Sequence, residues 1–461
     1  MQKVLLLPIL FFIIVTAYSQ NADLIKNYKF RVEKYKAIDL GFNTNGQNSN
    51  NFGNGIINRS INAGLNTNLI CLRSTDKIYR VINSGLITSF ESNSKKDISN
   101  PFKIRQANIT PYFTVNNKWY FKNNFLEIGT EILAGSNSRK ETNLLASTSS
   151  SKYNVKNFEE NLVVGVGKGR LENVTDMQNA IWLAKILEED KNLSRKLTLD
   201  EINGLAKELT KSNNFRILDN RRKIIYTLKV IDKYLQSKNV IAKTDINYFA
   251  NLNDILYFAN NAFRQSGTIK YVRLIPHFGN NEDIGEQKVS SSVNKYIYSN
   301  KNIGAKLRIG YEKYKPINLY KQLEYGFSAN ALYNENKINN KSYSNTILIS
   351  ENDLNNIEKN VGLDYFINYK FYPNTRTVIS AAFSGENKYQ FYKNSSSLNN
   401  DTFIQSEFKI SVNANYFINH NTRFLLEIGE NYTQRVSQNT SIYANLFHNS
   451  LYANAGIRIS I

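Results

Sequence analysis

The sequence predicts an all-β transmembrane antiparallel barrel that carries an inserted α-helical segment. Three features predict it: apolar and polar residues alternate through many segments, short turns alternate with long loops, and one stretch changes to helical periodicity. The alternation is clearest where Phe408, Ile410 and Val412 fall on one parity. Lys409 and Ser411 fall on the other. Because successive strand residues point to opposite faces, one face suits lipid and the other suits water.

The N-terminus has the features of a secretory signal peptide. Lys3 precedes an apolar run over 4–17, and Ala17-Tyr18-Ser19 provides a small-residue cleavage site before Gln20. The run is shorter than the ~20 residues that a spanning helix needs. We therefore expect residues 1–19 to be removed on export. A single cysteine, Cys71, excludes an intramolecular disulfide framework.

The formal net charge is +20, and the hydrophobic content is 41%. A basic balance of this size often indicates nucleic-acid binding. Export excludes nucleic acid as the expected partner and favours outer-membrane lipids or anions in a lumen. The modest hydrophobic content also fits a barrel, because only every second strand residue needs to be apolar.

Counting segments from turn to turn predicts fourteen strands with both chain ends on the periplasmic side, although twelve or sixteen remain open. Short turns belong to the periplasmic side and long loops to the outer side. We assign Asn116-Asn117-Lys118 as a short turn and 135–154, 279–300 and 336–357 as long loops. The predicted strands are 30–43, 59–73, 78–93, 103–115, 118–134, 155–168, 268–278, 301–315, 319–335, 358–371, 376–392, 403–418, 423–436 and 441–461.

Residues 170–267 interrupt the strand pattern, so barrel strands occupy 20–169 and 268–461. Thr198 and Glu201 form a capping box at the start of one of four predicted helices. The apolar residues that recur at helical spacing include Ile202, Leu205, Leu209, Ile224, Leu228, Ile231, Leu235, Phe249, Leu252, Leu256 and Phe263. We expect a periplasmic four-helix insertion that binds a periplasmic partner or packs on the barrel; a plug inside the lumen is the alternative.

Charged residues on the non-lipid parity define the candidate functional site. Mixed charges with a basic excess indicate a water-filled path that favours anions. A closed lumen filled by ion-paired side chains is the alternative. The residues expected to face the lumen are Lys306, Arg308, Glu312, Asp364, Lys370, Glu407, Lys409, Glu427 and Arg458.

The run Gly165-Val166-Gly167-Lys168-Gly169-Arg170-Leu171-Glu172-Asn173-Val174-Thr175-Asp176 is followed by a helical insert and more strands. Together with the Ala-Tyr-Ser-Gln signal ending, it resembles a group of uncharacterised outer-membrane proteins of Bacteroidota. The resemblance implies location and architecture, and no activity. The last strand alternates up to Ile461 and resembles the C-terminal signature that the barrel assembly machinery recognises, although such signatures usually end in an aromatic residue.

No catalytic, cofactor-binding or metal site is predicted. The glycines at 165, 167 and 169 lack the spacing of a dinucleotide or Walker loop, so we interpret them as a softened strand exit. A hydrolase would need His277 beside Ser290–Ser292 on the outer wall, and no motif supports that arrangement. The leading hypothesis is a porin-like channel for small solutes, with anions as the expected class. The alternatives are a non-conducting interaction protein and a barrel enzyme that acts on outer-leaflet lipid.

Overall fold

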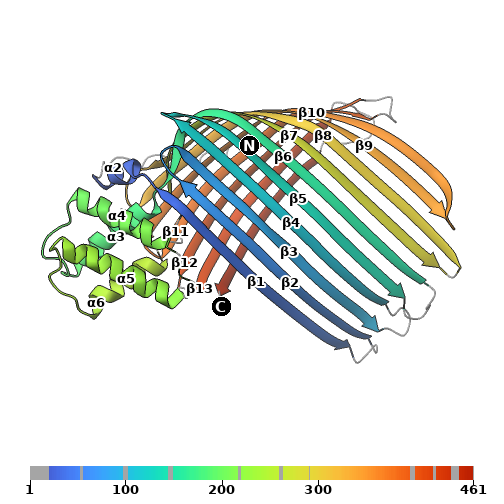
Figure 1. Ribbon diagram of the computed structural model, residues 1–461. Helices are drawn as coiled ribbons and strands as arrows, with labels where there is room; N and C mark the ends of the chain where they lie inside the picture. Colours follow the sequence, from blue (N-terminus) through green and yellow to red (C-terminus); the bar gives the residue numbers. More distant parts are fainter. Residues whose placement is uncertain are drawn as a thin grey trace.

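The computed structural model describes residues 20–51, 56–96, 102–143, 149–215, 217, 220–258, 263–289, 291–394, 400–418, 422–437 and 446–459. Its fourteen strands pair antiparallel in chain order, each with its sequence neighbours, and curl into a barrel (Figure 1). The predicted fold class and strand number are confirmed. The strands are β1 (Val32–Asn51), β2 (Ile56–Ser74), β3 (Ile78–Lys96), β4 (Phe102–Phe121), β5 (Asn124–Asn143), β6 (Ser149–Asn173), β7 (Gln265–Val289), β8 (Ser292–Pro316), β9 (Lys321–Ser344), β10 (Ile347–Asn374), β11 (Thr377–Asn394), β12 (Asn400–Phe417), β13 (Thr422–Ser437) and β14 (Leu446–Ile459).

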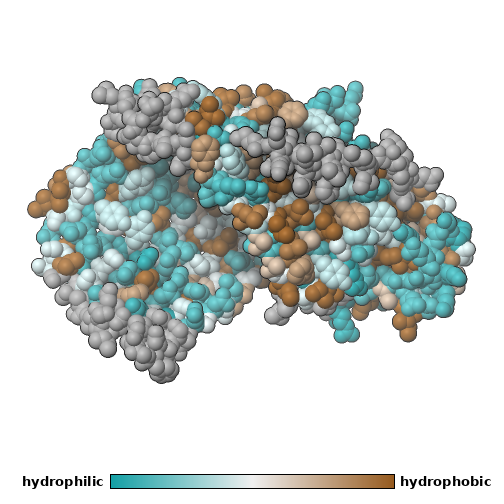
Figure 2. All heavy atoms as spheres, turned by 180° about the vertical axis from the view of Figure 1, so that it is seen from behind, coloured by the Kyte–Doolittle hydropathy of each residue, from teal (hydrophilic) through white to brown (hydrophobic). Residues whose placement is uncertain are grey.

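The outward face of the barrel carries apolar side chains that stay exposed among the described residues. Val166 on β6 is 57% exposed, Ile309 on β8 is 52% exposed and Val361 on β10 is 62% exposed. Seen from behind in Figure 2, hydrophobic side chains gather near the middle of the molecule, while the two ends are mainly hydrophilic. This distribution is what a lipid-facing band between two polar interfaces requires.

The turn predicted at Asn116-Asn117-Lys118 is wrong, because these residues lie within β4. Asn116 and Lys118 face the lumen, opposite Gly129 and Glu127 on β5. The chain reverses instead at Lys122-Asn123, where Lys122 has a left-handed φ of 59°. A cluster of polar residues in a strand thus looked like a turn because the lumen accepts polar side chains.

Three of the predicted long loops are largely strand. β7 runs to Val289 and β8 begins at Ser292, while β9 runs to Ser344 and β10 begins at Ile347. β5 likewise extends to Asn143, well into the predicted loop over 135–154. These segments are rich in Asn, Ser and Lys, but backbone hydrogen bonds hold the ladder whatever the side chains are. The link predicted at 437–440 and the first residues of the last predicted strand fall largely outside the described residues.

The two edge strands, β1 and β14, are not paired with each other among the described residues. Their outward residues are nevertheless apolar, as in the other strands. Phe42 on β1 is 75% exposed and Leu451 on β14 is 79% exposed. The edges therefore have the same lipid-facing character as the rest of the wall.

The five described helices, α2–α6, gather at one end of the barrel, beyond the strand ends (Figure 1). This end also carries the β2–β3, β8–β9 and β10–β11 turns, and we call it the inner mouth. No described helix is long and apolar enough to cross a membrane. The helices are α2 (Gln20–Asn27), α3 (Thr175–Glu189), α4 (Leu199–Asn213), α5 (Asn220–Ser237) and α6 (Ile246–Phe258).

The four helices of the insertion, α3–α6, share one hydrophobic core. Leu183 on α3, Leu205 on α4 and Leu235 on α5 are fully buried in it. Phe249, which the helical spacing placed in the apolar stripe of α6, is 46% exposed, and Tyr248 is buried instead. Tyr248 donates its hydroxyl to Asp232 on α5 at 2.9 Å, so a tyrosine with a polar partner takes the inward position.

The N-terminal helix α2 was not predicted and joins the same core. Ile25 is fully buried there, and the Tyr28 hydroxyl reaches Thr210 on α4 at 2.6 Å. Thr210 in turn donates to the buried carboxylate of Asp176 on α3. Burial raises the pKa of Asp176 and of Tyr28. The segment before β1 thus contacts the insertion, although Tyr28 and Thr210 are 182 residues apart in the sequence.

The capping box of α4 gives a prediction about the insertion. Thr198 accepts a hydrogen bond from the Glu201 amide at 3.3 Å, and Glu201 accepts one from the Thr198 amide at 2.8 Å. Thr198→Ala should lower the free energy of unfolding of the helices by about 1 kcal/mol. A urea titration followed by helical circular dichroism measures this loss.

The same site predicts a pH dependence. Hydrogen bonds from Arg195, and then from the Thr198 amide, lower the pKa of Glu201 to about 2. Its contribution is present above the unfolded pKa of about 4.3 and is lost as the pH falls toward 2. Glu201→Gln should therefore flatten the fall of the urea midpoint across this window. Part of the slope remains because Lys243 lowers the pKa of Asp245 to about 2. Glu208→Gln, a control on the same helix, should keep the wild-type slope.

Candidate functional site: the polar lumen and its inner mouth

The strand register places eight of the nine candidate residues on the lumen face of β8–β13. Arg308 and Glu312 alternate with outward Ile309, and Asp364 lies opposite Ser328. The ninth residue, Arg458 on β14, lies opposite Arg423 and has the lumen-facing parity, but its side chain is outside the described residues. The eight side chains that the structure describes are those of Lys306, Arg308, Glu312, Asp364, Lys370, Glu407, Lys409 and Glu427.

Five of these residues surround one open cavity of about 680 Å³ between β7 and β14. Four carboxylates line it and only two fixed cations, Arg308 and Lys409. Tyr271 and His448 add further polar groups. The basic excess expected from the sequence is therefore absent here, and the expected preference for anions has no support in this cavity. The four carboxylates are Glu312, Asp364, Glu386 and Glu407.

Many charged lumen side chains have a partner on the next strand or on the strand after it. Arg308 reaches Asp364 at 3.5 Å, and Asp364 also accepts from Ser328 at 3.1 Å. Lys370 reaches Glu324 at 2.7 Å. Such pairs line the wall while leaving the cavity open between them, so paired charges and an open cavity occur together.

A second charged cluster, absent from the sequence-based candidates, crosses strands β4 to β7. Glu127 on β5 is 1% exposed and accepts from Arg273 on β7 at 2.8 Å. Lys118 on β4 lies 3.7 Å away and Asn116 donates at 2.9 Å. The signal that could have revealed it is a carboxylate at an inward position between outward Leu126 and Ile128.

The glycines of β6 explain how Arg273 reaches past one strand to Glu127. Gly165 lies between them in the register, and a Cβ there would meet the Arg273 Cγ at 2.9 Å. A Cβ on Gly167 would meet the Phe125 ring at 2.3 Å. Gly169, with φ +94°, and Gly267, with φ +130°, then bend the β6–β7 ribbon toward the helices. The expected softened exit applies to Gly169, whereas Gly165 and Gly167 make room for neighbouring side chains.

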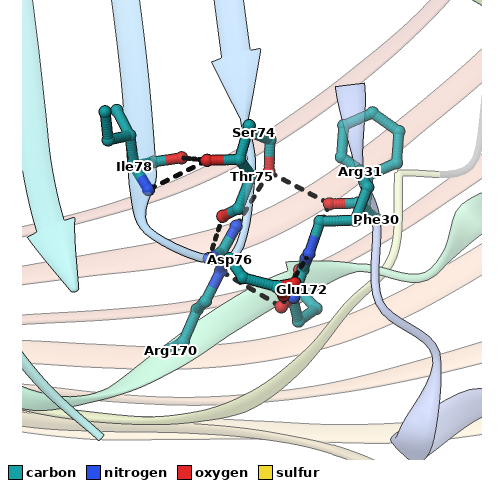
Figure 3. Close-up of polar contacts among 8 residues, drawn as sticks. All are labelled: Phe30, Arg31, Ser74, Thr75, Asp76, Ile78, Arg170 and Glu172. Carbon is teal, nitrogen blue, oxygen red and sulfur yellow. Dashed lines mark hydrogen bonds and ion pairs between the residues drawn. The ribbon is translucent and has the colours of Figure 1, made fainter. Parts of the chain in front are cut away.

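At the inner mouth, an ion-pair cluster joins the N-terminal segment to the exit of β6 (Figure 3). Arg31 donates to Asp76 at 2.8 Å and to Glu172 at 2.9 Å. Arg170 donates to the Thr75 carbonyl at 2.6 Å and pairs with Glu172 at 3.1 Å. The hydrogen bond from Arg31 lowers the pKa of Asp76. The cluster fixes the β2–β3 turn against the strand that leads into the insertion.

On another side of the mouth, the fully buried Arg264 holds the insertion to the β8–β9 turn. Its guanidinium donates to the carbonyl oxygens of Leu319 at 2.9 Å and Lys321 at 2.8 Å, and to the Gln322 side chain at 2.7 Å. Burial lowers the pKa of Arg264 to about 10. Trp182 on α3 packs edge-to-face on Tyr320 of the same turn, with ring centroids 5.3 Å apart.

A third contact lies at the β10–β11 turn. Arg376 pairs with Asp254 on α6, and Thr375 donates to the same carboxylate at 3.2 Å. Tyr35 on β1 and Leu72 on β2 pack against the core of the helices. In a fourteen-stranded barrel the β1–β2 and β8–β9 positions lie on opposite sides of the circle. A domain that touches both sides therefore crosses the mouth. The helices lie beyond the strand ends rather than between the walls, so the lumen-plug alternative is not the arrangement seen (Figure 1).

The residues considered for hydrolysis do not meet. His277 lies on the lumen face, and its Nε2 is 3.0 Å from the Asn334 amide oxygen. Ser292 begins β8, twelve register positions from the partner of His277, which is about 40 Å at 3.3 Å per residue. Ser290 falls outside the described residues. Within the described ranges no three His, Cys, Asp or Glu residues gather as metal ligands.

Comparisons with known proteins give similar folds without close relatives. No family model matches the chain, and no curated protein matches it. Among solved structures, the translocator domain of the autotransporter NalP from Neisseria meningitidis has 8% identity and a TM-score of 0.26, covering 84% of this chain and 90% of that one. The Pseudomonas putida toluene transporter TodX has 8% identity and a TM-score of 0.28, covering 92% and 93%. Since these TM-scores are below 0.5, they add no argument to the strand pairing described above.

The Glu127 cluster predicts a large effect on barrel stability. Glu127→Gln leaves Arg273 and Lys118 without their carboxylate in a buried place, and removing one partner of a buried pair costs about 3–5 kcal/mol. Urea unfolding followed by Trp119 fluorescence in a Trp182→Phe background would measure the loss. Glu131→Gln, four residues further along β5 and on the same lumen-facing parity, is the matched control and should change little. The double variant Glu127→Gln/Arg273→Gln should recover part of the loss; equal stability of Glu127→Gln and wild type would contradict the assignment.

Proposed function

We propose that the protein is an outer-membrane channel for small solutes, with the helical insertion on the periplasmic side. The observation that carries the proposal is the combination of an uncovered apolar outer wall with a polar lumen that contains an open cavity of about 680 Å³. A polar lumen of this kind holds water, and rings of charge along it select among ions. The four carboxylates and two cations around the cavity favour cations over anions.

A conductance measurement tests the channel and its selectivity together. Purified protein in planar bilayers should conduct, and its reversal potential in a KCl gradient should have the sign of a cation preference. Glu386→Gln/Glu407→Gln removes two carboxylates that lie opposite each other in the register and should shift the potential toward zero. Glu160→Gln/Glu282→Gln, on the outward face, should leave it unchanged. Absence of any conductance, in wild type and in a variant without residues 174–264, would contradict the channel.

The position of the insertion across the mouth supports a specific role for it within this channel. Contacts at the β1–β2, β8–β9 and β10–β11 positions hold the helices over the path that a solute must take. We therefore propose that solutes pass when α6 separates from the β10–β11 turn. This contact is made by side chains alone, through Asp254 with Thr375 and Arg376.

A disulfide at that contact would test the movement. In a Cys71→Ser background, Asp254→Cys/Thr375→Cys joins α6 to the turn when oxidised. Conductance should fall on oxidation and return on reduction, because the bond prevents separation. Each single-cysteine variant should be insensitive to oxidant. Equal conductance of the oxidised and reduced double variant would show that α6 does not need to move.

The second candidate is a non-conducting protein whose helices bind a periplasmic partner. The observation that favours it is the position of the helices across the mouth together with the paired lumen charges. Two results together would select this candidate. The full-length protein would show no conductance, and it would capture one envelope component that a variant without residues 174–264 does not capture.

A further inference from the structure

Three lysines lie together on the outward face of the barrel beside the inner mouth. Lys168 on β6 is directly opposite Lys270 on β7. Lys313 on β8 lies opposite Thr268, which is two residues before Lys270 and nearer the inner mouth. Each alternates with a lumen-facing neighbour, so all three point away from the lumen. Lys168 and Lys270 are exposed and Lys313 is half-buried. We call this group the lysine patch.

The positive charge of the patch has no protein counter-charge. Like charges directly opposite each other on neighbouring strands destabilise a sheet. None of the three lysines forms an ion pair with a carboxylate among the described residues. The carboxylates nearest in the register face the lumen and are already engaged: Glu127 with Arg273, and Glu312 with the Tyr271 hydroxyl at 3.1 Å. The lumen cations, by contrast, mostly have acidic partners.

The rows beside the patch have the chemistry of a membrane interface. The register aligns Lys168 and Lys270 with Tyr311 on β8, whose ring stacks on Phe327 with centroids 5.6 Å apart. The Lys270 ammonium lies 5.7 Å from the Tyr311 ring centre. Aromatic residues of this kind collect at the level of lipid headgroups.

One row further from the mouth, the outward residues are apolar. Val166, Val272 and Ile309 form a continuous cross-strand row, two residues along each strand from the Lys168–Lys270–Tyr311 row. They are 57%, 41% and 52% exposed. Two strand residues span about 7 Å, roughly the step from a lipid phosphate to the start of its acyl chains. The wall therefore presents a row of lysines with the Tyr311 ring and then a row of hydrocarbon, in the order of a phospholipid headgroup and its acyl chains.

We propose that the lysine patch binds the headgroup of an anionic phospholipid from the leaflet on the side of the helical insertion. The phosphate lies among Lys168, Lys270 and Lys313, and the acyl chains lie along the Val166–Val272–Ile309 row. Charge complementarity selects an anionic lipid over a zwitterionic one. The apolar row selects a lipid over free phosphate. This inference rests on the membrane placement of the proposed function, but not on conduction.

Lipid retention measured by native mass spectrometry tests the proposal. Full-length protein is reconstituted in vesicles of equal phosphatidylcholine and phosphatidylglycerol, its insertion is verified by co-flotation, and the lipids that remain bound after detergent release are counted. Wild type should retain phosphatidylglycerol in preference to phosphatidylcholine. Lys168→Gln/Lys270→Gln/Lys313→Gln should lose this preference, by about five-fold in affinity for each lysine removed.

A matched variant separates the patch from overall charge. Lys103→Gln/Lys301→Gln/Lys359→Gln removes three outward lysines toward the other end of the barrel and should keep the wild-type preference. An unchanged preference in the patch variant, or an equal loss in the control, would overturn the lipid site. Displacement of the retained lipid by inorganic phosphate would also overturn it, because a lipid held by its chains resists a free headgroup. Failure of wild type to co-float would instead overturn the membrane placement.

Discussion

This structure is governed by backbone hydrogen bonding: in a medium without water, every backbone amide and carbonyl needs a hydrogen-bond partner within the protein. Lipid offers no hydrogen bonds, so a chain that crosses it as strands must satisfy each group with the next strand. The fourteen strands do this in chain order, which leaves side chains free to differ on the two faces. Outward positions such as Val361 can then be apolar while their neighbours, such as Asn360, remain polar. The alternation is a consequence of the ladder, and the polar lumen is a consequence of the alternation.

That constraint also explains why charge can be buried in the wall. Glu127 is almost inaccessible, yet it lies in a lumen whose other residues can approach it from both sides. Gly165 removes the side chain between Glu127 and Arg273, so an ion pair crosses a strand that would otherwise separate the partners. Without that glycine the guanidinium would need another path, and burial of the carboxylate would be costly. The glycine motif thus serves electrostatics as well as backbone curvature.

The period-two and period-3.6 patterns were sufficient to predict the barrel, its strand number, the helical insertion and the lumen face of β8–β13. Boundaries were harder because lumen-facing polar residues look like turn residues: Asn116 and Lys118 were mistaken for a turn for this reason. The Asn-rich extensions of β7 to β10 were mistaken for loops, since backbone pairing leaves no mark on composition. The Arg273–Glu127 pair and the Arg264 contacts escaped prediction because their partners lie far away in sequence. A carboxylate on a lumen parity does not reveal which cation will face it.

The inner mouth shows how the edge of the barrel is held where the ladder ends. β1 has a strand neighbour on one side only among the described residues, so its inner end needs other contacts. Arg31, directly before β1, reaches Glu172 on β6, and Tyr28 reaches Thr210 in the insertion. The insertion is in turn fixed by Arg264 to the β8–β9 turn. The first strand is therefore held through the helices to the opposite side of the wall. The proposed opening of the mouth is expected to leave this connection intact. Separation of α6 at the β10–β11 turn satisfies that condition, because it breaks the Asp254 contact while the Arg31 and Arg264 contacts remain.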